Sequence, residues 1–283
     1  MLSYLSQVLS YSSRNLMTVG AAALFVFSIV SRHDIALGQS RLDAQYTISA
    51  AGVSIGKSQI TAQITDAQYS ASATGHASGF LSILVKGEGT ASVRGSIADG
   101  RLRPAQFTAA IKKDDENSEI KMTFDGDSVA ELSAQSVVSD AGRVPVTDDL
   151  RKGIVDPLTA VLLVNGSPGT MSDGICQRTL PIFDGRRRFD LDLKFSRMDQ
   201  AKTSKGYQGP VVVCSVKFRP IAGHHPTSTL VQYLAGGREI ELWLAPIKGT
   251  PLLAPLRLTT TNTIGNLVVD ADQFEISVLT GGQ

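Results

Sequence analysis

Hydrophobic and polar positions alternate through most of the chain from Leu42 onward. A period of two is typical of strands that bury one face, and turn residues interrupt the pattern about every ten positions. The clearest case is Arg188–Phe195, in which apolar and charged side chains alternate directly after Asp184-Gly185. An Asp-Gly pair before such a run indicates a hairpin turn. The pattern therefore predicts a mainly β protein.

Further strands are predicted wherever alternating or β-branched segments lie between turn signals. They cover Leu42–Ala50, Val53–Ile64, Ala67–Ala73, Gly89–Ile97, Ala105–Lys112, Glu119–Phe124, Ser128–Val138, Val211–Phe218, Arg238–Leu244, Leu256–Thr263 and Leu267–Val278. Parallel strands need helical crossovers, and the sequence predicts a single convincing helix, so we expect antiparallel connections. Gly79–Val85 fits either a short helix or a buried strand, and periodicity does not decide between them.

The predicted helix begins at Asp156-Pro157 and ends at Asn165-Gly166. Aspartate suits the N-cap, proline the first helical position, and an Asn-Gly pair the C-terminal cap. Apolar residues lie nearly all round it, which indicates burial against the sheet. We expect Leu162 and its neighbours on one side to pack on the apolar face of Arg188–Phe195.

The first 38 residues differ in character from the rest. An amino-terminal region with one basic residue leads into the apolar run Leu16–Val30, and Ala36-Leu37-Gly38 follows. As a helix the run would span about 22 Å, short of the roughly 30 Å hydrocarbon core of a membrane. We therefore expect residues 1–38 to be a signal peptide cut after Gly38. An uncleaved amino-terminal anchor is the alternative.

Composition and charge narrow the class of protein. Of the 283 residues 42% are hydrophobic and 19% charged, which is ordinary for a folded domain, and residues 39–283 suffice for one large β domain. The net charge of +1 gives no electrostatic reason to expect nucleic-acid binding. With no repeat or linker in the sequence, we expect one domain that is soluble after cleavage and monomeric.

The two cysteines, Cys176 and Cys214, flank the predicted hairpin with thirty-seven residues between them. A redox pair would usually be Cys-x-x-Cys, a catalytic thiol needs a neighbouring base, and zinc needs further ligands. The spacing fits none of these. An exported chain with one cysteine pair is expected to form a structural disulfide, which indicates the periplasm as the compartment.

Other chemistry-bearing residues have simpler explanations beside the functional ones. Arg186, Arg187 and Arg188 could grip a phosphate or a carboxylate, or they could be a solvated turn that guards a strand edge. Trp243 could face a ligand cavity or simply cover the sheet. The pair His224-His225 and the acidic run Asp114–Glu116 are predicted to be loops, and neither has metal-ligand spacing. We therefore predict no metal, no cofactor and no enzymatic activity.

The order of the motifs resembles a known exported family. The features are Asp156-Pro-Leu-Thr-Ala-Val-Leu-Leu, Cys176, Phe183-Asp-Gly-Arg-Arg-Arg-Phe-Asp-Leu, Cys214, Trp243-Leu-Ala-Pro and Pro255-Leu-Arg. Over about residues 42–278 the chain is similar to the bacterial domain-of-unknown-function family numbered 3108. The resemblance implies a periplasmic protein with a strongly curved sheet, a half-barrel or β-spiral, similar to lipoprotein-carrier and β-spiral envelope-integrity proteins. It brings no catalytic residues.

Together these features predict a curved antiparallel sheet that encloses one short helix and carries one disulfide. The expected function is non-enzymatic support of cell-envelope integrity, with a lipid, a lipoprotein or a peptidoglycan component as partner. An apolar ligand would lie on the concave sheet face. Candidate ligand contacts are Arg186, Arg187, Arg188, Trp243 and Leu162. The alternative is an interaction protein that holds envelope partners through exposed strand edges.

Overall fold

The computed structural model describes residues 39–78, 87–113, 116–135, 141–166, 168, 171–237, 239–260 and 266–279. These residues lie in one compact unit that spans residues 36–283. The expected signal peptide, the ambiguous segment Gly79–Val85 and the acidic pair Asp114-Asp115 lie outside the described residues. Their predictions therefore stay predictions.

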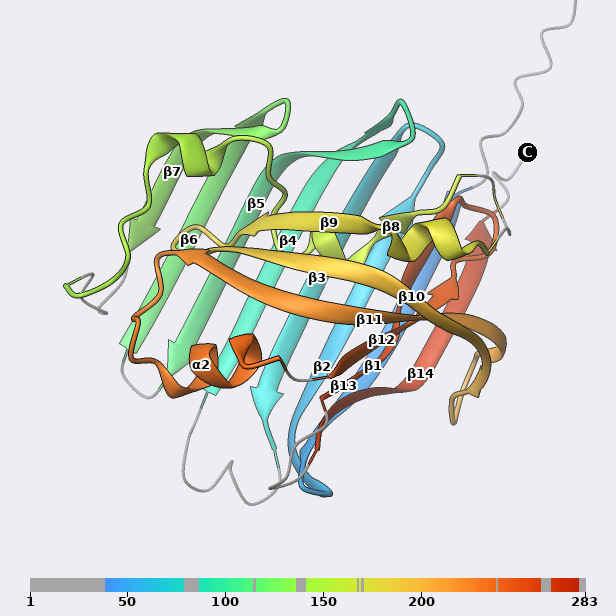
Figure 1. Ribbon diagram of the computed structural model, residues 1–283. Coiled ribbons are helices and arrows are strands. Elements are labelled where there is room, and N and C mark those ends of the chain that lie inside the picture. Colours follow the sequence, from blue (N-terminus) through green and yellow to red (C-terminus); the bar gives the residue numbers. More distant parts are fainter. Residues whose placement is uncertain are drawn as a thin grey trace, which may run out of the picture. The chain divides into compact units, whose positions relative to one another are not determined.

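Fourteen strands form one antiparallel sheet, in the order β7-β6-β5-β4-β3-β2-β1-β14-β13-β12-β11-β10-β9, with β8 paired to β13 (Figure 1). The strands of the first half are β1 (Gln39–Ala50), β2 (Val53–Ile64), β3 (Gln68–Ala77), β4 (Gly87–Ala98), β5 (Arg101–Lys113), β6 (Glu116–Asp125) and β7 (Ser128–Gln135). Those of the second half are β8 (Leu163–Val164), β9 (Arg178–Phe183), β10 (Arg188–Lys202), β11 (Gln208–Ala222), β12 (Ile240–Pro246), β13 (Leu252–Thr260) and β14 (Leu267–Leu279). Apart from β8, which pairs with β13, consecutive strands pair as hairpins, as the turn signals predicted.

The sheet curves back over itself, so that β9, β10 and β11 cross in front of the first-half strands (Figure 1). The space between these two layers holds the larger apolar core. Its buried side chains come from both layers and include Leu42, Ile64, Tyr69, Phe107, Met122, Phe183, Val211, Val213, Leu256 and Phe274. The predicted fold class, a curved antiparallel sheet with one disulfide, is confirmed.

Strand β11 is buried on both of its faces. Val211 and Val213 point into the core between the layers, whereas Val212 and Cys214 point into a second cluster on the opposite face. All four side chains are fully buried. A strand with two covered faces needs apolar side chains at successive positions, which explains the run Val-Val-Val-Cys and the similar buried run Leu252–Ala254 at the start of β13.

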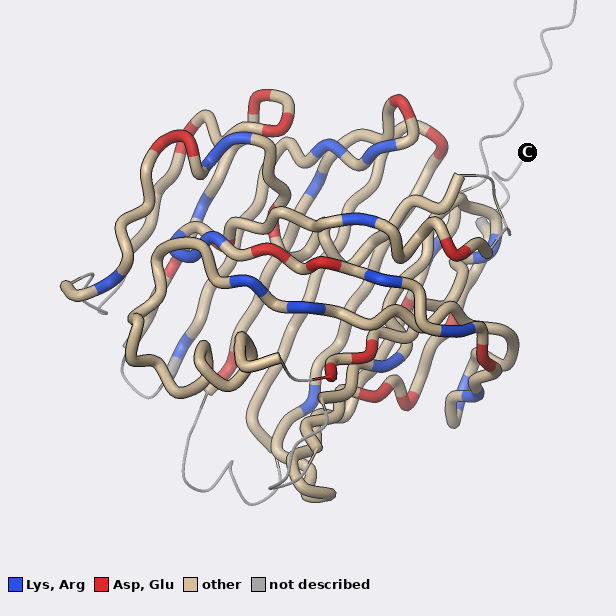
Figure 2. Tube along the Cα trace, in the orientation of Figure 1, with Lys and Arg blue, Asp and Glu red and all other residues tan. Residues whose placement is uncertain are grey.

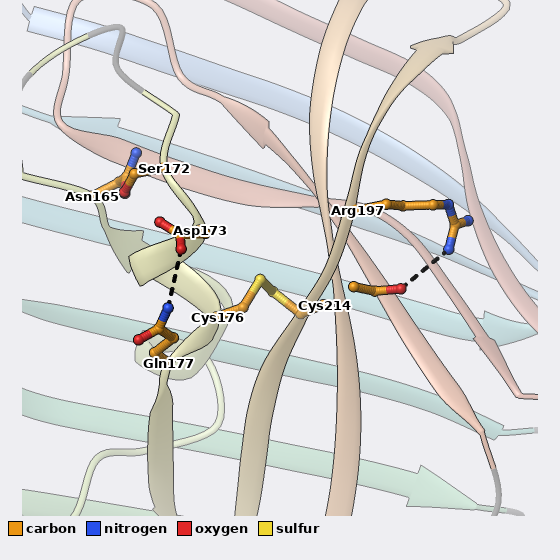
Figure 3. Close-up of a disulfide and its surroundings, with 8 residues drawn as sticks. Asn165, Ser172, Asp173, Cys176, Gln177, Arg197 and Cys214 are labelled. Carbon is orange, nitrogen blue, oxygen red and sulfur yellow. Dashed lines mark hydrogen bonds between the residues drawn. A yellow bond between two sulfur atoms is a disulfide. The ribbon is translucent and has the colours of Figure 1, made fainter.

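The second cluster is covered by a segment that the disulfide holds in place. Cys176 ends a short 3₁₀ turn, Asp173–Cys176, and its sulfur is bonded to that of Cys214 on β11 (Figure 3). The two Cα atoms are 5.4 Å apart. Ile175 packs beside the disulfide against Leu193 and Leu244 in the same cluster. The predicted disulfide is confirmed, and it fastens a covering segment to the sheet.

The prediction of an α-helix at Asp156–Gly166 is wrong. Asp156 accepts hydrogen bonds from the backbone N–H groups of Leu158 and Thr159, each at 2.9 Å, but only one 3₁₀ turn follows, Thr159–Val161. After Leu162, which ends that turn, Leu163 and Val164 extend as β8 along the edge of β13. Pairing with a strand edge satisfies backbone groups that a helix would have bonded internally, so tertiary contacts override the capping signals.

The α-helix among the described residues is α2, Thr229–Ala235, and none of its residues is buried. The packing expected for Leu162 is also corrected. Leu162 lies in the core between the layers, whereas Leu193 of β10 lies in the cluster on the other face of the sheet. Leu163, one position later, reaches the cluster of Leu193 instead. No described helix has the length and hydrophobicity needed to cross a membrane.

The disulfide should contribute strongly to stability. Closing a loop of this length is worth about 4 kcal/mol in the chain-entropy model. The double variant Cys176→Ala/Cys214→Ala removes the cross-link without burying a hydroxyl, and it should lower the melting temperature by roughly 10 °C. Thermal unfolding followed by circular dichroism measures this shift. An unchanged midpoint, or two titratable thiols in the native wild type, would contradict the prediction.

Two matched leucine truncations test the burial of the 156–164 segment. Leu162 is 4% exposed and Leu230 on α2 is 59% exposed. Leu162→Ala should cost about 2–5 kcal/mol, since it leaves a cavity in the core. Leu230→Ala should change the free energy of unfolding by less than about 0.5 kcal/mol. Urea unfolding monitored by the fluorescence of the single tryptophan gives both values, and similar costs for the two variants would mean that the segment is misplaced.

Candidate functional site

The turn between β9 and β10 presents the three consecutive arginines. Asp184 organises it, because its Oδ1 accepts hydrogen bonds from the backbone N–H groups of Arg186 at 2.9 Å and of Arg187 at 2.6 Å. Gly185 in this turn lies against the first-half strands, and a Cβ atom there would come within 2.4 Å of the Ile120 side chain on β6. The turn thus closes one end of the two-layer structure.

Arg187 and Arg188 are engaged by carboxylates of this chain. The guanidinium of Arg187 lies 3.0 Å from Asp184. Arg188 forms a mostly buried ion pair with Asp190, and Arg219 on β11 also reaches Asp190, at 2.9 Å. Figure 2 shows acidic and basic positions along β10, next to basic positions on β11. These two side chains therefore brace the hairpin, which agrees with the simpler explanation of the triplet.

Arg186 lies instead in a cleft that distant segments complete. Gly223 at the end of β11 has φ +76°, and a Cβ atom there would sit 1.8 Å from the carbonyl oxygen of Arg186. Only glycine permits this approach. The N–H of Gly223 donates to the carbonyl of Val144 at 2.7 Å, and the N–H of Val144 donates to the carbonyl of His224 at 2.9 Å. These contacts bring the 143–146 segment beside Arg186.

We call the resulting surface the arginine cleft. It has a volume of about 460 Å³. Its lining combines three arginines, apolar side chains and turn glycines: Leu132, Ala134, Arg143, Val144, Pro145, Val146, Arg151, Phe183, Gly185, Arg186 and Gly223. None of the described residues in this lining is acidic. The cleft is therefore suited to a ligand that is both anionic and partly apolar.

The two further arginines contact other groups of the protein. One guanidinium nitrogen of Arg143 donates to the carbonyl of Gly223 at 2.7 Å, which fixes its place at the cleft wall. Arg151 contacts Asp148 at 3.3 Å, but that carboxylate is 92% exposed and the pair is weak. The buried Nε of Arg151 has no hydrogen-bond partner among the described residues. A bound anion would give this side chain a partner.

The sequence identified Arg186 as a candidate but missed Arg143 and Arg151. Both lie about forty positions earlier, in a stretch whose polar, irregular pattern gave no signal of function. The contacts of Gly223 bring them to Arg186, and such contacts between distant segments cannot be read from local periodicity. Arg143-Val-Pro-Val146, a lone arginine before apolar residues, is the one local hint in that stretch.

Trp243 lies in a ladder of ion pairs across β10, β12, β13 and β14. The guanidinium carbons of Arg197 and Arg257 each lie 5.2 Å from the centre of its ring. The indole N–H donates to Glu241 at 3.1 Å. Glu241 also binds Arg197, which holds the pKa of that carboxyl below its usual range, and Arg257 contacts Asp270 at 2.8 Å. The indole ring of Trp243 is therefore contacted by charged side chains of the protein itself.

Leu162, also predicted to contact a ligand, lies in the core between the layers. Buried side chains of this core fill the concave face of the sheet. An apolar ligand would therefore reach Leu162 only if the two layers separated. Among the described residues, no group of three or more His, Cys, Asp or Glu side chains is placed to hold a metal ion. The adjacent pair His224-His225 lies in the loop after β11, where the backbone of His224 binds Val144.

Asp156 is the most deeply buried acidic residue in the described part of the chain. Asp156 is 0% exposed and its Oδ2 accepts a hydrogen bond from the hydroxyl of Thr159 at 2.5 Å. That hydroxyl lies 2.7 Å from the hydroxyl of Tyr69 on β3, so the three side chains connect the 156–164 segment to the first-half strands. Burial raises the pKa of Asp156, while its hydrogen bonds oppose the shift. The network is enclosed and holds the layers together.

The fold and the cleft define a class of protein. It is a disulfide-stabilised, mainly β domain, and its disulfide is typical of an extracytoplasmic location. The chain belongs to the family described as "Protein of unknown function (DUF3108)", whose model matches residues 45–272. The predicted family is thereby confirmed.

Comparison with solved structures finds two proteins of low sequence identity. The beta-barrel-like protein of domain of unknown function DUF1849 from Brucella abortus is 8% identical with a TM-score of 0.42, over 86% of this chain and 98% of that one. A putative lipoprotein from Parabacteroides distasonis is 9% identical with a TM-score of 0.31, over 83% of this chain and 95% of that one. No curated protein matches the chain.

The buried carboxyl should give stability an unusual dependence on pH. Because the pKa of Asp156 is raised by folding, its contribution is largest below its unfolded pKa of about 4 and declines as pH rises through the folded value. The free energy of urea unfolding of the wild type minus that of the Asp156→Asn variant should therefore increase as the pH falls from 7 toward 4.

Asp192 supplies the opposite control. Its pKa is lowered, mainly by the hydrogen bond from Arg219, so its contribution is present above pH 4 and is lost below it. The difference in unfolding free energy between the wild type and the Asp192→Asn variant should stay constant between pH 7 and 4 and decrease at lower pH. If the difference in unfolding free energy between the wild type and Asp156→Asn stayed constant between pH 7 and 4, the prediction for Asp156 would be contradicted.

Proposed function

We propose that the protein is a non-enzymatic periplasmic protein that supports cell-envelope integrity, and that it acts as a monomer by binding an anionic, partly apolar envelope component in the arginine cleft. The observation that carries the proposal is the gathering of three arginines and apolar walls in one cleft, none of whose described lining residues is acidic. Lipid, lipoprotein and peptidoglycan components all bear phosphate or carboxylate groups. Arginine binds either group in a bidentate geometry.

The packing of the core supports surface binding over a carrier function. An acyl chain needs an open apolar cavity, and the region between the layers is filled by buried side chains such as Phe183 and Phe274. The arginine cleft needs no such opening. Binding without catalysis is supported by the acids we have described on β10 and β12, since Asp190, Asp192 and Glu241 are each engaged by an arginine.

Native mass spectrometry of protein purified from the periplasm tests the proposal. Wild type should carry a bound anionic species, and Arg151→Gln/Arg186→Gln should lose at least four fifths of it, because both changes remove cleft charge. Arg94→Gln on β4 is the matched control, an exposed arginine outside the cleft. It should retain the ligand.

The same variants should differ in their ability to complement cells that lack the native gene. Wild type and Arg94→Gln should restore resistance to detergent and to large antibiotics, and the double cleft variant should not. Full restoration by the cleft variant, together with wild-type protein that carries no adduct, would refute the proposal.

A further inference from the structure

Residues 171–177 cover the second cluster, and we call them the disulfide cover. Ile175 and Cys176 are each 0% exposed and belong to that cluster, and Met171 packs against it. None of the residues 171–177, all of which the structure describes, belongs to the core between the layers or packs against it. The cover therefore serves one of the two clusters and leaves the other unaffected.

The hydrogen bonds of the cover are mostly internal. The backbone N–H groups of Ile175 and Gln177 donate to carbonyl groups within it, at 3.3 and 3.1 Å, and the side-chain amide of Gln177 donates to Asp173 at 3.2 Å (Figure 3). The hydroxyl of Ser172 donates to the side chain of Asn165 at 3.0 Å. Among the described residues no hydrogen bond joins the cover to β10 or β11. The disulfide and apolar contacts therefore hold it on these strands.

Both cysteines are inaccessible to solvent while the cover is in place. Cys214 on β11 is 0% exposed, as Cys176 is, and the buried side chains of Leu193 and Leu244 lie in the same cluster. Thiol–disulfide exchange requires the direct approach of a thiolate to one of the two sulfur atoms. A dithiol can therefore reach this bond only after the protein opens, either by unfolding of the whole domain or by local detachment of the cover.

We propose that the disulfide cover is a redox switch: it opens as a unit of its own, and reduction of the Cys176–Cys214 bond leaves it open while the core between the layers stays folded. In the exchange, one thiolate of an external dithiol attacks a cysteine sulfur and the S–S bond breaks. The second thiol then closes the reagent to a disulfide, and the two cysteines receive the two electrons and two protons that the dithiol gives up. This inference does not rest on the proposed function.

The rate of reduction by dithiothreitol distinguishes local opening from unfolding of the whole domain. Ile175→Ala weakens the contact of the cover with the second cluster, so it should speed reduction at least tenfold. Ile64 on β2 is the matched control, since it is 1% exposed and lies in the core between the layers. Ile64→Ala should change the rate less than twofold, although it destabilises the whole domain. Thiols formed in the oxidised, exported protein are alkylated and counted by mass spectrometry.

Equal acceleration by the two truncations would mean that the reagent reaches the bond through global unfolding, and this result would overturn the proposal. An unchanged rate for Ile175→Ala would overturn it as well. If either alanine variant fails to fold, Ile175→Val and Ile64→Val repeat the comparison with a smaller loss of contact. Ile175→Val should still speed reduction at least twofold, and Ile64→Val should not.

Hydrogen exchange of the reduced wild type measures what reduction does to the structure. The amides of Ile175 and Gln177 should exchange at least tenfold faster than in the oxidised protein, because a single turn released from the sheet does not keep its hydrogen bonds in water. Amides of the β1–β2 ladder should change less than twofold. Protection that persists at Ile175 and Gln177, or that is lost throughout the sheet, would overturn the proposal.

Discussion

Burial of β11 on both faces is the constraint on which the rest of the structure depends. Its inward side chains need the first-half strands, and its outward side chains need a second layer of cover. The sheet alone meets the first need by curving back over itself. The segment that ends at Cys176 meets the second, and the disulfide attaches it to the strand that it covers. Removal of either cover would expose fully buried aliphatic side chains, each worth about 1.5–3 kcal/mol.

The same curvature explains where charge can accumulate. Where the layers lie close together, the acids of β10 and β12 are neutralised by arginines on neighbouring strands, as in the pairs Asp192–Arg219 and Glu241–Arg197. At the β7 end the two layers are joined by the turn between β9 and β10 and by the 143–146 segment, instead of by a ladder of ion pairs. Arg143, Arg151 and Arg186 gather there beside apolar walls, and none of the described residues that line the cleft is acidic. The proposed anionic partner would bind at this end.

Filled packing between the layers also bears on what kind of binding protein this is. A concave sheet can enclose a ligand only if its inner side chains leave room, and here Leu162, Phe183 and Phe274 occupy that face. The arginine cleft is accessible without any change in the core. A protein of this form therefore suits binding at its surface better than the carriage of a lipid inside.

The sequence by itself determined the β class, most strand positions and the disulfide. Val53–Ile64 was predicted with the bounds it has, because alternation and turn residues act locally. Cys176 and Cys214 were paired correctly because nothing else fits their spacing in an exported chain. The segment after Asp156 was predicted as a helix and is an extended strand at its end, because the edge of β13 offers its backbone better partners. The arginine cleft depended wholly on tertiary structure, since only the close approach at Gly223 joins Arg186 to a segment forty positions earlier.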